Sequence, residues 1–183
     1  MAHINEEALQ ASLQGLRGAA AAADLLAVMN RAVDSVNEIF GYSGAGIMFV
    51  TESGALSYVA ASDADGRRLE EAQATAGQGP CYESYVNACE VVSGDLRADG
   101  RWPELVAQLP PSVRAVLGMP IMLGGSPVGT LNTYHDQPTN WDDSDISALR
   151  AYASVIAEVA RVALAAQDHS ELADQLQYAL DYR

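Results

Sequence analysis

Two pairs of apolar, strand-like segments, each pair joined by a short glycine-containing turn, most constrain how this chain can fold. Residues 47–50 and 56–61 flank the turn TESG, and residues 113–123 and 128–135 flank the turn GGSP. Turns of this length join antiparallel strands into hairpins. Neither pair alternates cleanly between apolar and polar residues, and this pattern predicts a sheet that is covered on both faces.

Helical periodicity precedes and follows the two hairpins. From Ile4 to Phe40, apolar residues recur at intervals of three and four, and we expect two helices with a break near residues 15–18. From Asp142 the helical pattern continues toward the C-terminus, with Asp142 as the expected N-cap. Between the hairpins we expect a short helix around residues 67–74, a cysteine-containing segment and a loop with a helix around residues 101–111. The order of these elements predicts an α+β fold.

The charge of the chain excludes several functions. Acidic residues outnumber basic ones 24 to 10, and none of the basic residues is lysine. Lysine nucleophile and Schiff-base chemistry are therefore excluded, and a negative surface disfavours direct binding of nucleic acid or anionic membrane. No apolar run approaches the roughly 20 residues that cross a bilayer, and the N-terminus lacks a secretory pattern. We expect a soluble, cytoplasmic protein.

Both cysteines, Cys81 and Cys89, lie in the segment GQGPCYESYVNACEVV. Pro80 is suited to the first turn of a helix, and eight helical residues rise about 12 Å, too far for an intrachain disulfide. A zinc site is not expected, because the three histidines are scattered and no CxxC pair occurs. Cys81 is either a reactive or attachment thiol, with a pKa lowered by the helix N-terminus, or a small buried residue; Cys89 fits the buried reading.

Motifs of the common enzyme classes do not occur. The sequence contains no GxSxG, no P-loop and no GxGxxG, and Asp95, Asp99 and Asp142 are not paired with a histidine at a recognised catalytic spacing. The residues alone indicate a single α+β domain.

Four segments, in this order, carry a family resemblance: SYVAAS, GQGPCYESYVNACEVVSGDLRADGRWPEL, VRAVLGMPIMLGGSPVGTLNTYH and WDDSDISALRAYASVIAEVA. Together they resemble a GAF domain, the sensory module of bacterial signalling proteins, over residues 24–166. GPC, DLRADGRWP and VRAVLGMPI are similar to the GAF branch that precedes an ANTAR output domain, the RNA-binding unit of transcription antiterminators. The last residues, LADQLQYALDYR, resemble the opening of such a domain without its usual continuation, so we expect an ANTAR output that is missing or truncated.

The resemblance implies a GAF-like, PAS-related fold. A central antiparallel sheet of five to six strands would carry the N- and C-terminal helices on one face and the inserted helices and loops on the other. We expect an N-terminal helix in residues 1–22, a GAF sensory domain in residues 23–166 and a C-terminal helical extension in residues 167–183, the candidate start of the ANTAR domain.

GAF domains bind small molecules between one sheet face and the inserted helices, and the resemblance implies a pocket at eight residues: Tyr58, Cys81, Tyr85, Asp95, Trp102, Arg114, Asn132 and Tyr134. The aromatic members could equally fill the core, and Arg114 could bind a ligand carboxylate or phosphate or form an internal ion pair with Asp95 or Asp99. The ligand is not identified. Without lysine the cyclic-nucleotide signature is incomplete, Cys81 lacks the sequence context of a bilin attachment site, and haem would rest on His135 alone.

Three hypotheses follow from the resemblance. The first is a non-enzymatic sensor that signals through helices of a homodimer to a transcription-antitermination output. The second is a thiol-based redox sensor or reductase acting through Cys81, and the third is a purely structural dimerisation module. We expect the homodimer because apolar stripes follow the N-terminal helices and the C-terminal helix, where Leu172 and Leu176 extend them. The alternative for the part beyond Ala166 is a helix that folds back on its own domain. RNA would bind only through the missing output domain.

Overall fold

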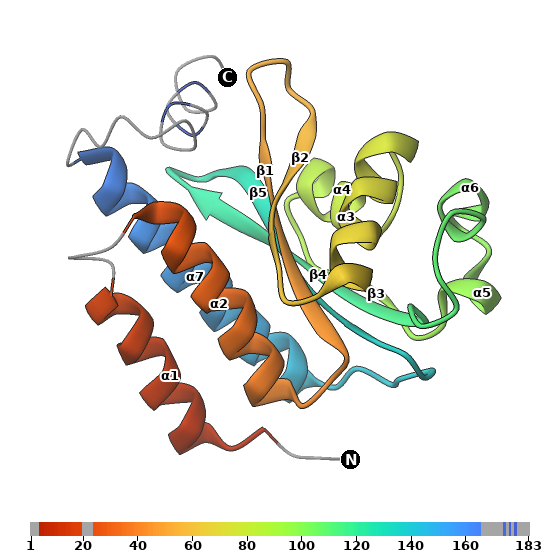
Figure 1. Cartoon of the computed structure of the whole chain (residues 1–183), viewed down its shortest axis with the longest axis horizontal. Helices are drawn as coiled ribbons and strands as arrows, with labels where there is room; N and C mark the ends of the chain where they lie inside the picture. The colour runs from red at the N-terminus through yellow and green to blue at the C-terminus, as the bar shows by residue number, and fades with distance from the viewer. Residues whose placement is uncertain (1–3, 20–23, 166–173, 175, 177, 179–183) are drawn as a thin grey trace.

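The structure, a computed structural model, describes residues 4–19, 24–165, 174, 176 and 178, and these form three layers (Figure 1). A five-stranded antiparallel sheet lies in the middle. Helices α1 (Glu6–Ala19), α2 (Leu25–Phe40) and α7 (Asp143–Ala165) cover one face. The other face carries the helices inserted between the hairpins: α3 (Ala64–Ala76), α4 (Pro80–Asn87), α5 (Leu96–Asp99) and α6 (Pro103–Val106). The predicted α+β architecture is confirmed.

The sheet has the strand order β2-β1-β5-β4-β3. β1 (Gly44–Val50) and β2 (Leu56–Ala61) form the first predicted hairpin, and β4 (Ala115–Leu123) and β5 (Ser126–His135) form the second. β5 pairs with β1 and joins the hairpins, while the short β3 (Val91–Ser93) pairs with β4. Every residue of β1 is buried, because helices cover both faces of the sheet, as the lack of alternation predicts.

The start of α7 agrees with the boundary predicted from the sequence, whereas the end of α1 does not. The Asp142 side chain accepts hydrogen bonds from the backbone N–H groups of Ser144 and Asp145, at 2.8 and 3.0 Å, and so caps α7 as predicted. The break expected near residues 15–18 is wrong, since α1 continues through both glycines to Ala19. A glycine in an exposed helix costs only about 1 kcal/mol, which the burial of the neighbouring leucines offsets.

The helical layer forms much of the main hydrophobic core. Leu9, Leu13 and Leu16 of α1 are buried against α2 and α7, and Leu176 is buried in the same core. Of the helix stripes predicted to meet a second copy, these described residues are buried within one chain, and the homodimer stays a prediction. Leu172 and most of the extension over residues 167–183 lie outside the described residues. Within the described part of the chain, no helix is long and apolar enough to cross a membrane.

Helix α4 begins as predicted at Pro80 but ends before the second cysteine. Ala88 has a left-handed backbone conformation, with φ of 53°, and stops the helix at Asn87. Cys89 therefore lies beyond the helix and is exposed, so the expectation of a buried Cys89 is wrong. Cys81 is buried, and both thiols are free.

Candidate functional site

Six polar side chains meet between the sheet and the inserted helices, and each residue is at most 1% exposed. They come from α3, α4 and β5, and we call them the buried polar cluster: Glu70, Gln73, Cys81, Ser84, Thr130 and Asn132. Successive side chains of a strand point to opposite faces, so Thr130 and Asn132 project from the same face of β5. Ser84 lies one turn after Cys81, on the same side of α4.

Two glycines beside Asn132 let the helices approach the sheet. Asn132 of β5 pairs with Gly46 on β1 and with Gly118 on β4. A Cβ atom at Gly46 would collide with the Glu70 carboxyl group, and one at Gly118 would lie 3.1 Å from the carbonyl oxygen of Pro80. Any larger residue would push Glu70 or the start of α4 away from the sheet, so both glycines define the shape of the site.

Hydrogen bonds link four members of the cluster, Glu70, Gln73, Cys81 and Asn132, across three elements. The Asn132 Nδ2 group donates to Glu70 Oε1 and lies 3.1 Å from Cys81 Sγ. The backbone N–H of Cys81 donates to Gln73 Oε1 at 2.8 Å. These bonds fix the orientation of both amides, since each must present its donor or acceptor to a known partner.

The remaining polar atoms of the cluster have no hydrogen-bond partner among the described residues. They are Glu70 Oε2, Gln73 Nε2, Ser84 Oγ, Thr130 Oγ1 and Asn132 Oδ1. The Gln73 and Thr130 side chains also lie near the Cys81 thiol and oppose the rise of its pKa, but neither atom makes a hydrogen bond of normal geometry to it. A buried polar group without a partner costs roughly 1–3 kcal/mol, and native proteins contain few of them. Five such atoms lie in this one cluster, which makes it the candidate functional site.

Burial controls the protonation of the cluster. It raises the pKa of Glu70 to about 8, despite the opposing hydrogen bond from Asn132. It also raises the pKa of Cys81 well above its ordinary value, and the nearby Glu70 carboxylate raises it further. Of the two alternatives for Cys81, the small buried residue is the one that the structure shows, because desolvation of the thiolate outweighs the effect of the helix N-terminus.

The structure brings some of the predicted pocket residues to this cluster. Cys81 and Asn132 are members, and Tyr85 packs beside Cys81 with Met48 of β1. Tyr58 lies on β2, where the Arg67 guanidinium group sits 5.1 Å from its ring centroid.

The aromatic residues Trp102 and Tyr134 lie in a second hydrophobic core, apart from the buried polar cluster. The Trp102 indole N–H donates to Glu83 at 2.7 Å, and the Tyr134 hydroxyl donates to Asp63 at 2.6 Å. Both residues fill the core, which is the alternative that the sequence left open.

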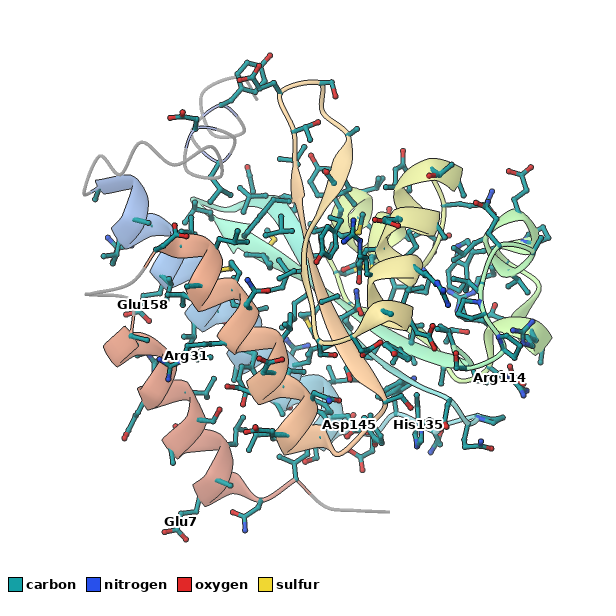
Figure 2. The ribbon with its side chains drawn as sticks, viewed as in Figure 1. Glu7, Arg31, Arg114, His135, Asp145 and Glu158 are labelled. Atoms are coloured by element: carbon teal, nitrogen blue, oxygen red, sulfur yellow. The ribbon has the colours of Figure 1, made fainter. Side chains whose placement is uncertain are left out.

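The charged pair Asp95 and Arg114 lies apart from the cluster as well. The Arg114 guanidinium donates two hydrogen bonds to the Asp95 carboxylate, at 2.6 and 3.1 Å, and this lowers the pKa of Asp95. Figure 2 shows Arg114 beside α5 and His135 near the same end of the sheet. The internal ion pair is thus the alternative that the structure realises.

Sequence reasoning missed four members of the cluster: Glu70, Gln73, Ser84 and Thr130. A hollow of about 280 Å³ lies apart from the cluster, between the end of α4, β4 and α7, where Arg150 pairs with Glu90 at 3.1 Å. No three histidine, cysteine, aspartate or glutamate side chains gather into a candidate metal site in the described residues.

Comparisons with known proteins identify the fold family. The family model for the GAF domain matches residues 22–159. The GAF domain of an Acinetobacter phosphoenolpyruvate-protein phosphotransferase superposes with a TM-score of 0.71 at 17% identity, covering 93% of this chain and 100% of that one. The corresponding Coxiella burnetii domain gives a TM-score of 0.69 at 16% identity, with coverage of 88% and 98%.

An enzyme is similar to the same degree. Free methionine-R-sulfoxide reductase from Neisseria meningitidis, solved with its substrate, gives a TM-score of 0.71 at 20% identity, covering 88% of this chain and 95% of that one. No curated protein sequence matches the chain. At these identities the solved structures show the fold alone. The family match over residues 22–159, together with this fold, shows that the chain belongs to the GAF domain family.

Proposed function

We propose that this GAF domain is a non-enzymatic sensor that binds a small polar molecule at the buried polar cluster. One observation carries the proposal: five buried polar atoms from α3, α4 and β5 have no partner among the described residues. A bound molecule between the sheet and the inserted helices would supply those partners.

The energetics give such a molecule a large effect. At roughly 1–3 kcal/mol each, five unpartnered atoms would cost about 5–15 kcal/mol in total. This is as large as the net stability of a typical domain, which is about 5–15 kcal/mol. A ligand that satisfies even some of them would stabilise the arrangement of α3 and α4 on the sheet.

The route of the signal follows from the packing. α4 packs on β4 and β5, and α7 packs on the opposite face of the same two strands. A ligand that favours one position of α4 would therefore bias the position of α7, provided that it binds the two arrangements with different affinity. The proposed output is transcription antitermination, supported by the resemblance of the last residues to the start of an ANTAR domain.

The cysteines support binding over thiol catalysis. A reactive cysteine is a partly exposed thiol with a lowered pKa. Cys81 is fully buried with a raised pKa, and Cys89 lies beyond the end of α4. We therefore expect no turnover of free methionine sulfoxide by this chain.

Native mass spectrometry of the freshly purified chain tests the proposal. A retained small molecule should add mass that disappears on denaturation. Ser84→Ala, which removes an unpartnered hydroxyl, should lower the retained fraction while raising the melting temperature of the ligand-free protein. Ser154→Ala is the matched control, because that exposed hydroxyl bonds only to the Arg150 carbonyl. Absence of added mass, together with no ligand in a metabolite screen whose effect depends on Ser84, would refute the proposal.

A further inference from the structure

The pattern of acceptors and charges in the buried polar cluster points to the chemical class of its ligand. We propose that the site takes a small organic cation with planar N–H donors, of the amidinium or guanidinium type, which binds Glu70 Oε2 and Asn132 Oδ1. This inference rests on the function proposed above and adds the ligand class to it.

The first support is the arrangement of acceptors. When Glu70 is ionised, two of the unpartnered atoms, Glu70 Oε2 and Asn132 Oδ1, are oxygens that only accept hydrogen bonds. Their side chains are already joined, because Asn132 Nδ2 donates to Glu70 Oε1. The two free oxygens therefore belong to neighbouring groups, which suits two N–H groups on one planar cation. The hydroxyls of Ser84 and Thr130 can accept further N–H groups, and only Gln73 Nε2 is an obligate donor.

The second support is the distribution of positive charge. The chain has no lysine, and the arginines on this side of the sheet are all engaged nearer the surface. Arg67 pairs with Glu71, Arg68 with Asp65, Arg101 with Asp99 and Arg114 with Asp95. Arg97 donates to the Pro110 carbonyl. Glu70 and Cys81 are the ionisable members of the cluster, and neither can be cationic. An anionic ligand would bury its charge without a counter-ion, whereas a cation would pair with Glu70.

Binding of a cation would be coupled to release of a proton. The neighbouring titratable groups are the Cys81 thiol and the Tyr85 phenol on α4, the Tyr58 phenol on β2, and Arg67 one turn earlier on α3. Burial keeps the Cys81 thiol protonated and raises the pKa of Glu70 to about 8. The carboxylate that the cation needs is thus a minority species at neutral pH. The affinity for the cation should increase about tenfold for each pH unit up to pH 7. From pH 6 to pH 8 it should increase roughly fiftyfold in total, and above that it should level off.

Three molecules of nearly the same shape test the ligand class: acetamidinium, acetamide and acetate. Each is titrated into the full ¹⁵N-labelled chain at pH 6, 7 and 8, and the backbone amide shifts of Cys81 and Asn132 are followed. Acetamidinium should bind most tightly, with the pH dependence given above. Acetate should leave both amides unshifted.

Two variants assign the effect to one carboxyl group. Glu70→Gln keeps the shape of the side chain without its charge and should abolish both the preference for acetamidinium and the pH dependence. Glu71→Gln, at an exposed neighbouring position on α3, should preserve both. The amide spectrum of each variant reports whether its fold is intact.

The unfavourable outcomes separate this inference from the proposed function. Binding of acetamide or acetate as tight as that of acetamidinium would overturn the cationic class and leave the cluster a ligand site. Failure of all three probes to shift Cys81 and Asn132, while the purified chain retains a molecule, would also overturn only the class. Failure of all three with no retained molecule would overturn both.

Discussion

Replacing Glu70 with glutamine should change how the stability of the ligand-free domain depends on pH. Glu70 is completely buried, and its carboxyl group has one bonded oxygen and one unpartnered oxygen. Glutamine has nearly the same shape and can still accept from Asn132, but it cannot ionise. The variant therefore isolates the cost of burying the carboxylate.

The size of the effect follows from the raised pKa of Glu70. Between the ordinary value of 4.5 and about 8, the folded chain binds a proton at Glu70 that the unfolded chain has lost. Stability therefore falls as pH rises through this window, by about 1.4 kcal/mol per pH unit, and levels off above pH 8. The total is roughly 5 kcal/mol, and the variant lacks this loss.

Urea denaturation of the wild type and the variant, from pH 5 to pH 9, measures the difference directly. The advantage of Glu70→Gln should grow steadily from pH 5 to pH 8 and then stay constant. Subtracting the two curves removes the pH dependence that both chains share through their acidic surface. Glu71→Gln is the control and should follow the wild type. Parallel curves for Glu70→Gln and the wild type would refute the assignment of a buried, neutral Glu70.

Three further predictions concern the thiols, the glycines and the assembly. Cys89 should react with a thiol reagent in the folded protein and Cys81 only on unfolding; equal rates would contradict the burial of Cys81. Gly118→Ala should destabilise the domain by about 1–3 kcal/mol, because its Cβ would press on the Pro80 carbonyl. Gly15→Ala, in an exposed turn of α1, should stabilise the domain by about 0.5–1 kcal/mol. Thermal denaturation that ranks the two variants in the opposite order would be inconsistent with the site geometry. Sedimentation velocity at tens of micromolar should show the predicted homodimer, and a monomer would remove that part of the signalling route.

The sheet and its helices could be predicted from sequence because their signals are local. Alternating turns and apolar runs define the hairpins, and Pro80 and Asp142 mark two helix starts. The end of α4 could not be predicted, because alanine at position 88 adopts a conformation that glycine usually occupies. The sequence therefore predicts a helix that reaches Cys89, two residues beyond its end at Asn87.

The candidate site was predictable only in part, because it depends on tertiary contacts. Cys81 and Asn132 are expected from the GAF resemblance, whereas the buried Thr130, two positions before Asn132 on the same strand, is not. Glu70 and Gln73 belong to a helix rich in polar residues, most of which face solvent, and nothing in their spacing distinguishes the two that face the sheet. Their role depends on the absence of a Cβ at Gly46, which pairing across strands brings beside Glu70. That relation is visible only when the sheet is assembled.

A crystal structure of the freshly purified chain at high resolution would test the ligand site most directly. We predict electron density for a bound molecule within hydrogen-bond distance of Glu70 Oε2 and Asn132 Oδ1, beneath α3 and α4. A cluster in which the six side chains pair only with one another, with no density among them and no unpartnered atom, would contradict the account.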